Sequence, residues 1–262
     1  MDLVLCPERQ PYLQDHRLAG RPVLPLAAAL DLLLWGVERR PPFSLTEIRV
    51  ERGMVVRGAA RVRTRRDADL LTLLEVRPSG REVPAFRARL EGSPPPPPSA
   101  RSDGESLPLE LSLQEFYRSR TFHGPRLQGI SRITRRTSTS LEALLDTSVP
   151  SEWYPTEPRT EWHLDPLTLD SAFQLAIYWT RSTGEQGLLP RGVNRLVVLE
   201  PFPPGVVEAR LELVSQAGDE LTGDYRFRKD GRLLGWMQGV RGRLTAPELF
   251  RPPSSGARPP AV

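Results

Sequence analysis

His16 is one of three histidines in the 262-residue chain, and it lies where proton transfer is easily arranged. Gly20 and Pro25 follow it, and then an apolar stretch from Leu26 to Trp35 that predicts a buried helix. Imidazole is largely neutral at neutral pH because its ordinary pKa is about 6.5, and burial lowers that pKa further. We therefore interpret His16 as a candidate general base where a polar loop meets a hydrophobic helix.

A second candidate group lies in the other half of the chain. Asp165 and Pro166 are typical of a helix start, with the aspartate as N-cap and the proline at the first helical position. Asp170 is then the fifth helical residue, and Gln174 shares its face four residues later. A general acid must keep its proton near neutral pH, so we expect desolvation to raise the pKa of Asp170. We expect Gln174 to hydrogen-bond the Asp170 carboxyl or a substrate hydroxyl.

The order of these residues resembles the dehydratase domains of polyketide and polyunsaturated fatty-acid synthases. The family motif His-x-x-x-Gly-x-x-x-x-Pro is filled by His16, Gly20 and Pro25. The motif Asp-x-x-x-Gln is filled by Asp170 and Gln174. Members of this family remove water from 3-hydroxyacyl groups carried on an acyl carrier protein. The resemblance implies the same reaction here, catalysed by a hydro-lyase with His16 as base and Asp170 as acid.

Two further segments resemble the family with substitutions. The Tyr-Gly-Pro segment is present as His123, Gly124 and Pro125, so a histidine replaces the tyrosine. The resemblance implies that His123 hydrogen-bonds the active-site carboxyl, and the alternative is a structural turn with an exposed histidine. In the Leu-Pro-Phe-x-Trp segment, Arg191 and Val193 replace the aromatic residues.

Other interpretations of the same residues stay open. Gly20 either lets a backbone N–H approach the thioester oxygen or is a plain turn glycine. A double-bond isomerase or an oxa-Michael cyclase needs the same acid and base as a dehydratase. An inactive double hotdog that binds acyl chains or holds a synthase together is a third alternative. Retention of His16 and Asp170 favours an enzyme, whereas the substituted aromatic positions favour the inactive protein.

Helical and alternating patterns together predict an α+β fold. Each half pairs one apolar helix, over 26–36 and from 166 onward, with segments that read as strands. The strands are expected at 45–50, 54–62, 70–76, 85–90 and 207–213, with a hairpin turn at Asp230-Gly231. The family resemblance implies a double hotdog, in which each of two subdomains wraps an antiparallel sheet around a central helix.

Five consecutive prolines, 94–98, predict a semi-rigid linker between the halves. We therefore expect an N-terminal hotdog at 1–92, a linker at 93–108 and a C-terminal hotdog at 109–248. The segment 249–262 is expected to be a disordered tail because its end is rich in Pro, Ser and Gly.

Composition narrows the partners and the compartment. The single cysteine excludes an intramolecular disulfide, and no Cys or His spacing is typical of a zinc site, so no metal is predicted. No apolar run is long enough for a membrane span, and no signal peptide is evident, which predicts a cytoplasmic protein. The arginine-rich run 61–66 lacks interleaved aromatic residues and is read as a solvated strand end, so nucleic acid is not expected to bind.

The family resemblance also implies partners. The substrate would arrive on the phosphopantetheine of an acyl carrier protein, with no other cofactor. Further synthase subunits and a second copy of the chain are additional candidate partners. Carrier proteins of this family are acidic, so we expect docking at Arg17, Arg21 and Arg126, which flank motif residues.

Overall fold

The computed structural model describes residues 1–37, 39–99, 104–157, 159–184 and 186–250. The first half contributes β1 (Asp2–Leu5), β2 (Arg17–Leu18), β3 (Arg21–Pro22), α1 (Leu26–Trp35), β4 (Phe43–Val50), β5 (Ala60–Asp67), β6 (Leu70–Val76) and β7 (Glu82–Glu91). The second half contributes α2 (Leu113–Glu115), β8 (Ile130–Arg136), β9 (Ser140–Asp146), α3 (Pro150–Trp153), α4 (Pro166–Thr183), β10 (Gly187–Val198), β11 (Val206–Ala217), β12 (Glu220–Lys229) and β13 (Arg232–Thr245). Short 3-10 helices cover Pro11–Asp15, Pro125–Leu127 and Pro247–Phe250, and a π-helix covers Phe116–Arg120.

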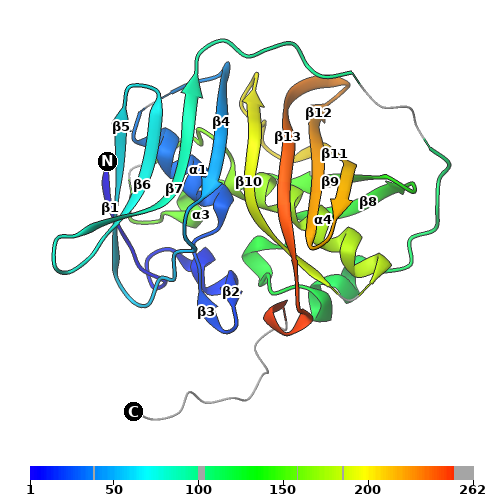
Figure 1. Ribbon diagram of the computed structural model, residues 1–262, viewed down its shortest axis with the longest axis horizontal. Coiled ribbons are helices and arrows are strands. Elements are labelled where there is room, and N and C mark those ends of the chain that lie inside the picture. The colour runs from blue at the N-terminus through cyan, green and yellow to red at the C-terminus, as the bar shows by residue number, and fades with distance from the viewer. Residues whose placement is uncertain (38, 100–103, 158, 185, 251–262) are drawn as a thin grey trace.

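One antiparallel sheet of 11 strands runs across the described residues in the order β1-β5-β6-β7-β4-β10-β13-β12-β11-β9-β8. The halves meet where β4 pairs with β10, with Leu45 opposite Leu196. Figure 1 shows α1 and α4 on the same face of this sheet, and the two helices contact each other. A single face of the sheet therefore covers both central helices.

The central helices form where the sequence predicts them. Residues 26–34 of α1 are all buried, as expected for a helix that is apolar on every face. Asp165 caps α4 and accepts hydrogen bonds from the backbone N–H groups of Leu167 (2.9 Å) and Thr168 (3.4 Å). Both predicted helix starts are confirmed, and Asp170 is the fifth residue of α4.

The strand predictions are confirmed except at one place. The predicted strand 54–62 is wrong for 54–59, because β5 begins only at Ala60. Residues 54–56 instead pair with the loop before α1, where Leu24 N–H donates to the Met54 carbonyl (2.9 Å). Gly58, with φ +67, then redirects the chain into β5. The hairpin at Asp230-Gly231 is confirmed by positive φ values of 51° and 77°.

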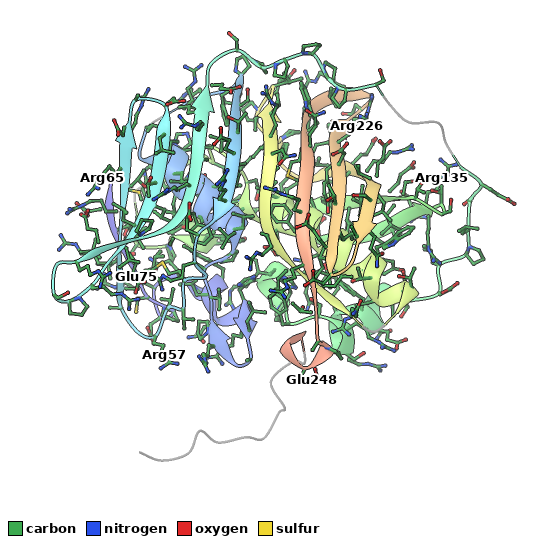
Figure 2. All side chains as sticks on the ribbon, viewed as in Figure 1. Arg57, Arg65, Glu75, Arg135, Arg226 and Glu248 are labelled. Carbon is green, nitrogen blue, oxygen red and sulfur yellow. The ribbon has the colours of Figure 1, made fainter. Side chains whose placement is uncertain are left out.

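The arginine-rich run lies on β5, and two of its arginines, Arg63 and Arg65, form ion pairs with neighbouring carboxylates. Thr64 Oγ1 donates to the Leu32 carbonyl of α1 (3.1 Å), so the neighbouring Arg63 and Arg65 point to the opposite face of the strand, because successive side chains alternate. Arg65 is labelled in Figure 2. Arg63 forms ion pairs with Asp2 (2.9 Å) and with Glu82 (2.7 Å). This pairing favours the interpretation of the run as a solvated strand.

The linker rests on the second half of the sheet. Arg226 on β12 donates to the carbonyls of Pro98 (3.2 Å) and Ser99 (2.6 Å), and Figure 2 shows it close to the linker. The division into 1–92, 93–108 and 109–248 stays a prediction. Of the predicted tail 249–262, residues 251–262 lie outside the described residues, and the 3-10 helix Pro247–Phe250 covers its start.

A buried ion pair fastens α1 to the segment that leads into α4. Asp31 is fully buried and receives both terminal nitrogens of Arg159, with Nη2 at 2.6 Å from Oδ1. The Arg159 guanidinium lies 4.6 Å from the ring centre of Trp35 and 4.7 Å from that of Trp162.

Within the described residues, no helix is long and apolar enough to cross a bilayer.

Candidate active site

A cavity of about 340 Å³ opens between α4, β10, β13 and the loop that precedes α1. His16, His123, Asp170 and Gln174 line it together with apolar side chains, among them Leu24, Leu26, Phe86, Phe122, Phe173 and Ile177. The structure thus brings both predicted catalytic residues to one cavity from distant parts of the chain. An apolar cavity with a few convergent polar groups is typical of a site that binds a small molecule.

His16 has the tautomer that a general base needs. Its Nδ1 lies 2.7 Å from the Val23 carbonyl oxygen, which can only accept, so Nδ1 carries the hydrogen. The lone pair is therefore on Nε2. Burial lowers the pKa of His16 to about 4, although the nearby charge of Asp170 opposes this shift. His16 is neutral at pH 7 as a result.

Asp170 is buried within a set of hydrogen-bond donors. Its Oδ2 accepts from Gln174 Nε2 (2.8 Å) and lies 3.3 Å from His123 Nε2. Burial acts to raise the pKa of Asp170, but His123 beside the carboxylate and the Gln174 hydrogen bond hold this pKa below its ordinary value. The expected rise in this pKa is therefore wrong, because donors around the carboxylate outweigh desolvation. The predicted contacts of Asp170 with Gln174 and His123 are present.

Tyr117 fixes the orientation of Gln174 and was not predicted from the sequence. Its hydroxyl donates to Gln174 Oε1 (3.0 Å) and accepts from the Ile130 N–H (2.9 Å). Gln174 Nε2 must then face Asp170 and the Leu127 carbonyl (2.7 Å). No spacing in the sequence links Tyr117 to Gln174, because they lie on separate elements.

Hydrogen bonds from Asp15 to the segment after His123 hold His16 beside His123. Asp15 accepts at its carbonyl from the Gly124 N–H (2.7 Å) and at Oδ2 from the Arg126 N–H (3.0 Å). A side chain at Gly124 would collide with Asp15, which explains the glycine there. His16 follows Asp15 and His123 precedes Gly124, so this pairing brings the two histidine rings together, with their centres 5.4 Å apart.

The remaining predicted site residues are two prolines, one glycine and three arginines, and the structure places each of them in a turn, at a helix start or near the surface. Pro25 precedes α1, and Pro125 opens the 3-10 helix that follows Gly124. Gly20 lies in the turn between β2 and β3 with φ +75, which favours its interpretation as a turn glycine. Arg17 is half-buried and Arg21 is exposed, whereas Arg126 Nη1 lies 3.4 Å from Asp15 Oδ2.

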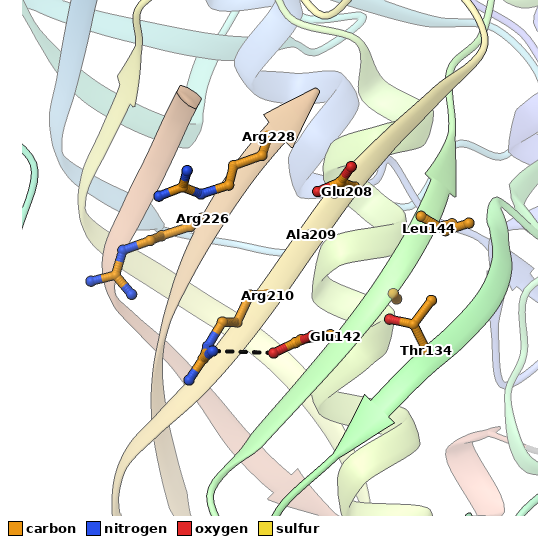
Figure 3. Close-up of a pocket in the computed structure, with 9 residues that line it drawn as sticks. Thr134, Glu142, Leu144, Glu208, Ala209, Arg210, Arg226 and Arg228 are labelled. Carbon is orange, nitrogen blue, oxygen red and sulfur yellow. Dashed lines mark hydrogen bonds and ion pairs between the residues drawn. The ribbon is translucent and has the colours of Figure 1, made fainter. Parts of the chain in front are cut away.

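Another hollow, of about 420 Å³, lies over β9, β11 and β12 (Figure 3). Arg210, Arg226 and Arg228 line it with Glu142, and Arg210 Nη1 lies 3.1 Å from Glu142 Oε1. Histidine and cysteine are missing from its described lining. The predicted catalytic residues His16 and Asp170 line the other cavity and not this hollow.

Two family models match the chain. The polyketide synthase dehydratase domain matches residues 3–70, which include His16, and the polyketide synthase dehydratase N-terminal domain matches residues 95–249, which include Asp170. The chain belongs to the polyketide synthase dehydratase family. This assignment confirms the predicted family, and the predicted hydro-lyase class is the one that the family name describes.

Relatives and solved structures agree with this assignment. A polyunsaturated fatty acid synthase subunit of Thraustochytrium sp. (strain ATCC 26185 / S-3) is 29% identical over 213 residues, which are 73% of this chain and 7% of that relative. This chain therefore spans only a small part of the synthase protein that it matches. The GphF dehydratase 1 structure has a TM-score of 0.73 at 19% identity. The match covers 94% of this chain and 93% of the GphF chain.

Two further solved structures share the fold. The dehydratase domain from the CurJ module of curacin polyketide synthase has a TM-score of 0.73 at 14% identity, covering 94% of this chain and 91% of its own. A trans-acyltransferase polyketide synthase enoyl-isomerase has a TM-score of 0.70 at 15% identity. The match covers 92% of this chain and 98% of the enoyl-isomerase chain. These likenesses confirm the predicted double hotdog.

Proposed function

We propose that the chain dehydrates a 3-hydroxyacyl thioester to the 2-enoyl thioester, with the acyl group carried on the phosphopantetheine of an acyl carrier protein. The observation that carries this proposal is a neutral imidazole facing a hydrogen-bonded carboxylate in one apolar cavity. Family membership supports it. The reaction needs a base and an acid on neighbouring carbons, and it requires no redox step.

In the first step, His16 Nε2 removes a proton from C2 of the substrate. The lone pair is available because the Val23 carbonyl holds the hydrogen on Nδ1 (2.7 Å). The electron pair of the C2–H bond then forms the C2=C3 double bond as the C3–O bond breaks. The apolar lining excludes water, so the proton goes to His16 instead of solvent.

In the second step, the departing hydroxyl receives a proton through Asp170. Because the pKa of Asp170 is held low, we assign the acid role to Asp170 and His123 together. His123 Nε2 lies 3.3 Å from Asp170 Oδ2, so a proton on this nitrogen can pass to the carboxylate, and His123 Nδ1 lies 2.6 Å from Thr121 Oγ1. Asp170 passes this proton to the C3 oxygen, which leaves as water.

Mass spectrometry separates this reaction from the alternatives that use the same residues. A 3-hydroxyacyl pantetheine thioester should lose about 18 Da, the mass of water, when the protein dehydrates it. An isomerase moves a double bond, and an oxa-Michael cyclase closes a ring, without any change of mass. The same protein offered an unhydroxylated enoyl thioester should leave its double bond in place. A shifted double bond in that arm, with no water lost in the first, assigns isomerisation instead.

The acid side of the pH profile should report the lowered pKa of His16. A base with a pKa of about 4 stays neutral down to that pH, so kcat/KM should stay level through pH 6.5 and fall about tenfold per unit only below about pH 4. Stopped-time assays in metal-free buffer, with aliquots returned to pH 7 to check recovery, measure this. An acid limb centred near the ordinary histidine pKa of about 6.5 contradicts the environment assigned to His16.

We propose that Arg17, Arg21 and Arg126 guide the carrier protein. The Arg21→Glu variant should raise KM for a carrier-bound substrate by about two- to tenfold, since exposed ion pairs are individually weak. Added salt should raise the wild-type KM in the same way. Kinetics with carrier-bound and pantetheine substrates provide the measurement. Arg66→Glu is the control, because β5 supplies no residue to the cavity lining, whereas Leu18 and Val23 on either side of Arg21 both line the cavity. Equal losses on both substrates would assign Arg21 to the fold.

A further inference from the structure

We propose that His16, His123 and Asp170 also form a binding site for a divalent transition-metal cation such as Zn²⁺. The inhibition expected from this site rests on the proposed function, whereas metal binding itself does not. No metal was predicted from the sequence, because zinc motifs are recognised by short spacings and these ligands come from three distant segments.

The distances between the three ligand atoms suit a small cation. One ligand atom from each residue lies within 4.8 Å of the other two, and His123 Nε2 is 3.3 Å from Asp170 Oδ2. Zinc bonds of about 2.0–2.1 Å in tetrahedral geometry place neighbouring ligand atoms about 3.3 Å apart. The His123–Asp170 edge therefore already has the required length. His16 needs to approach by at most about 1.5 Å, the difference between these two separations.

The outer nitrogen atoms of both histidines are already held by hydrogen bonds, and Gln174 holds the Asp170 oxygen that lies beside His123. His16 Nδ1 donates to the Val23 carbonyl (2.7 Å), and His123 Nδ1 lies 2.6 Å from Thr121 Oγ1. Gln174 Nε2 donates to the Asp170 carboxylate (2.8 Å). Metal-binding histidines are oriented by such partners, which hold the hydrogen on one ring nitrogen and leave the other as ligand. His123 Nε2 thus faces the carboxylate, and the lone pair of His16 Nε2 is available as a ligand.

The surroundings determine the class of cation. The three residues are 8%, 4% and 4% exposed, and all of them line the cavity, which provides an entry path and room for a fourth ligand. Imidazole suits zinc, cobalt and nickel, whereas magnesium and calcium prefer shells of oxygen. Two histidines and one carboxylate with an open position are a known zinc-site composition.

A bound cation would stop dehydration. It would occupy the His16 lone pair that removes the C2 proton and the Asp170 oxygen that delivers the acid proton. Zn²⁺ and substrate should therefore compete, so that added Zn²⁺ raises the apparent KM and a chelator restores activity.

Titration of the tag-free, metal-stripped protein without substrate tests the proposal. Co²⁺ at pH 7 should give a saturable visible spectrum with one ion per chain, and Zn²⁺ should displace it with a Kd on the order of micromolar. His123→Phe, which keeps a ring but removes the ligand, and Asp170→Asn should each weaken Zn²⁺ binding by at least about 100-fold. Circular dichroism checks that both variants fold.

Two matched controls distinguish this site from other donors. His163→Gln removes the third histidine, whose Nδ1 lies 3.1 Å from the Arg39 carbonyl, and Cys6→Ser removes the single thiol. Both should bind Zn²⁺ as the wild type does. Absence of saturable binding to the wild type, or unchanged affinity in folded His123→Phe and Asp170→Asn, overturns the metal site. Neither result bears on dehydration, which the mass measurement tests separately.

Discussion

Replacing His16 with alanine, or Asp170 with asparagine, should lower turnover of a 3-hydroxyacyl thioester by about two to four orders of magnitude. The first change removes the neutral Nε2 that accepts the C2 proton. The second keeps the shape of the side chain but removes the carboxylate that passes a proton to the C3 hydroxyl. Steady-state kinetics at pH 7 measure both effects, which should appear in kcat and kcat/KM together.

The third histidine provides the control for this prediction. His163 lies outside the cavity lining, so His163→Ala should retain nearly wild-type turnover. Thermal unfolding of all three variants separates lost chemistry from lost folding. If His16→Ala or Asp170→Asn kept nearly wild-type turnover, the role assigned to that residue would be wrong.

Breaking the buried Asp31–Arg159 pair should strongly destabilise the fold. Asp31→Ala leaves the Arg159 guanidinium buried, with a side chain only 4% exposed, and without its carboxylate. Removal of one partner from a buried ion pair typically costs about 3–5 kcal/mol in the free energy of unfolding. The Leu164 N–H would also lose its acceptor at Asp31 Oδ1 (3.2 Å). Urea unfolding followed by tryptophan fluorescence measures the loss.

A double variant tests whether the cost arises from an unpaired charge. Asp31→Leu combined with Arg159→Met replaces both charges by apolar side chains and should recover most of the stability, because buried pairs exchanged for apolar residues are often close to neutral. The double variant should therefore be more stable than Asp31→Ala. A cost below about 1 kcal/mol for Asp31→Ala would show that the pair does not hold α1 to the segment before α4.

Local patterns were sufficient to predict the central helices and the motif residues. The apolar run after Pro25 and the Asp165-Pro166 start depend on neighbouring residues alone, and both helices form as predicted. The hairpin at Asp230-Gly231 is equally local. The failed strand 54–59 differs, because its backbone partners lie in the loop before α1, which no local pattern specifies.

The electrostatics of the site depended on contacts that the sequence does not specify. Desolvation alone predicts a raised pKa for Asp170, and the reverse direction follows only once His123 and Gln174 are placed around it. Tyr117, which orients Gln174, has no motif of its own. The metal site depends in the same way on three segments that meet only in the folded chain. The sequence therefore predicted which residues line the cavity more readily than the direction of their pKa shifts.

The central claim is that His16 and Asp170 together remove water from a carrier-bound acyl chain. Intact-protein mass spectrometry of a 3-hydroxyacyl carrier protein, incubated with the wild type and with the His16→Ala/Asp170→Asn double variant, tests it most directly. We expect the carrier to lose about 18 Da with the wild type and to keep its mass with the double variant. An unchanged mass with the folded wild type, or equal water loss with the double variant, would contradict the proposed mechanism.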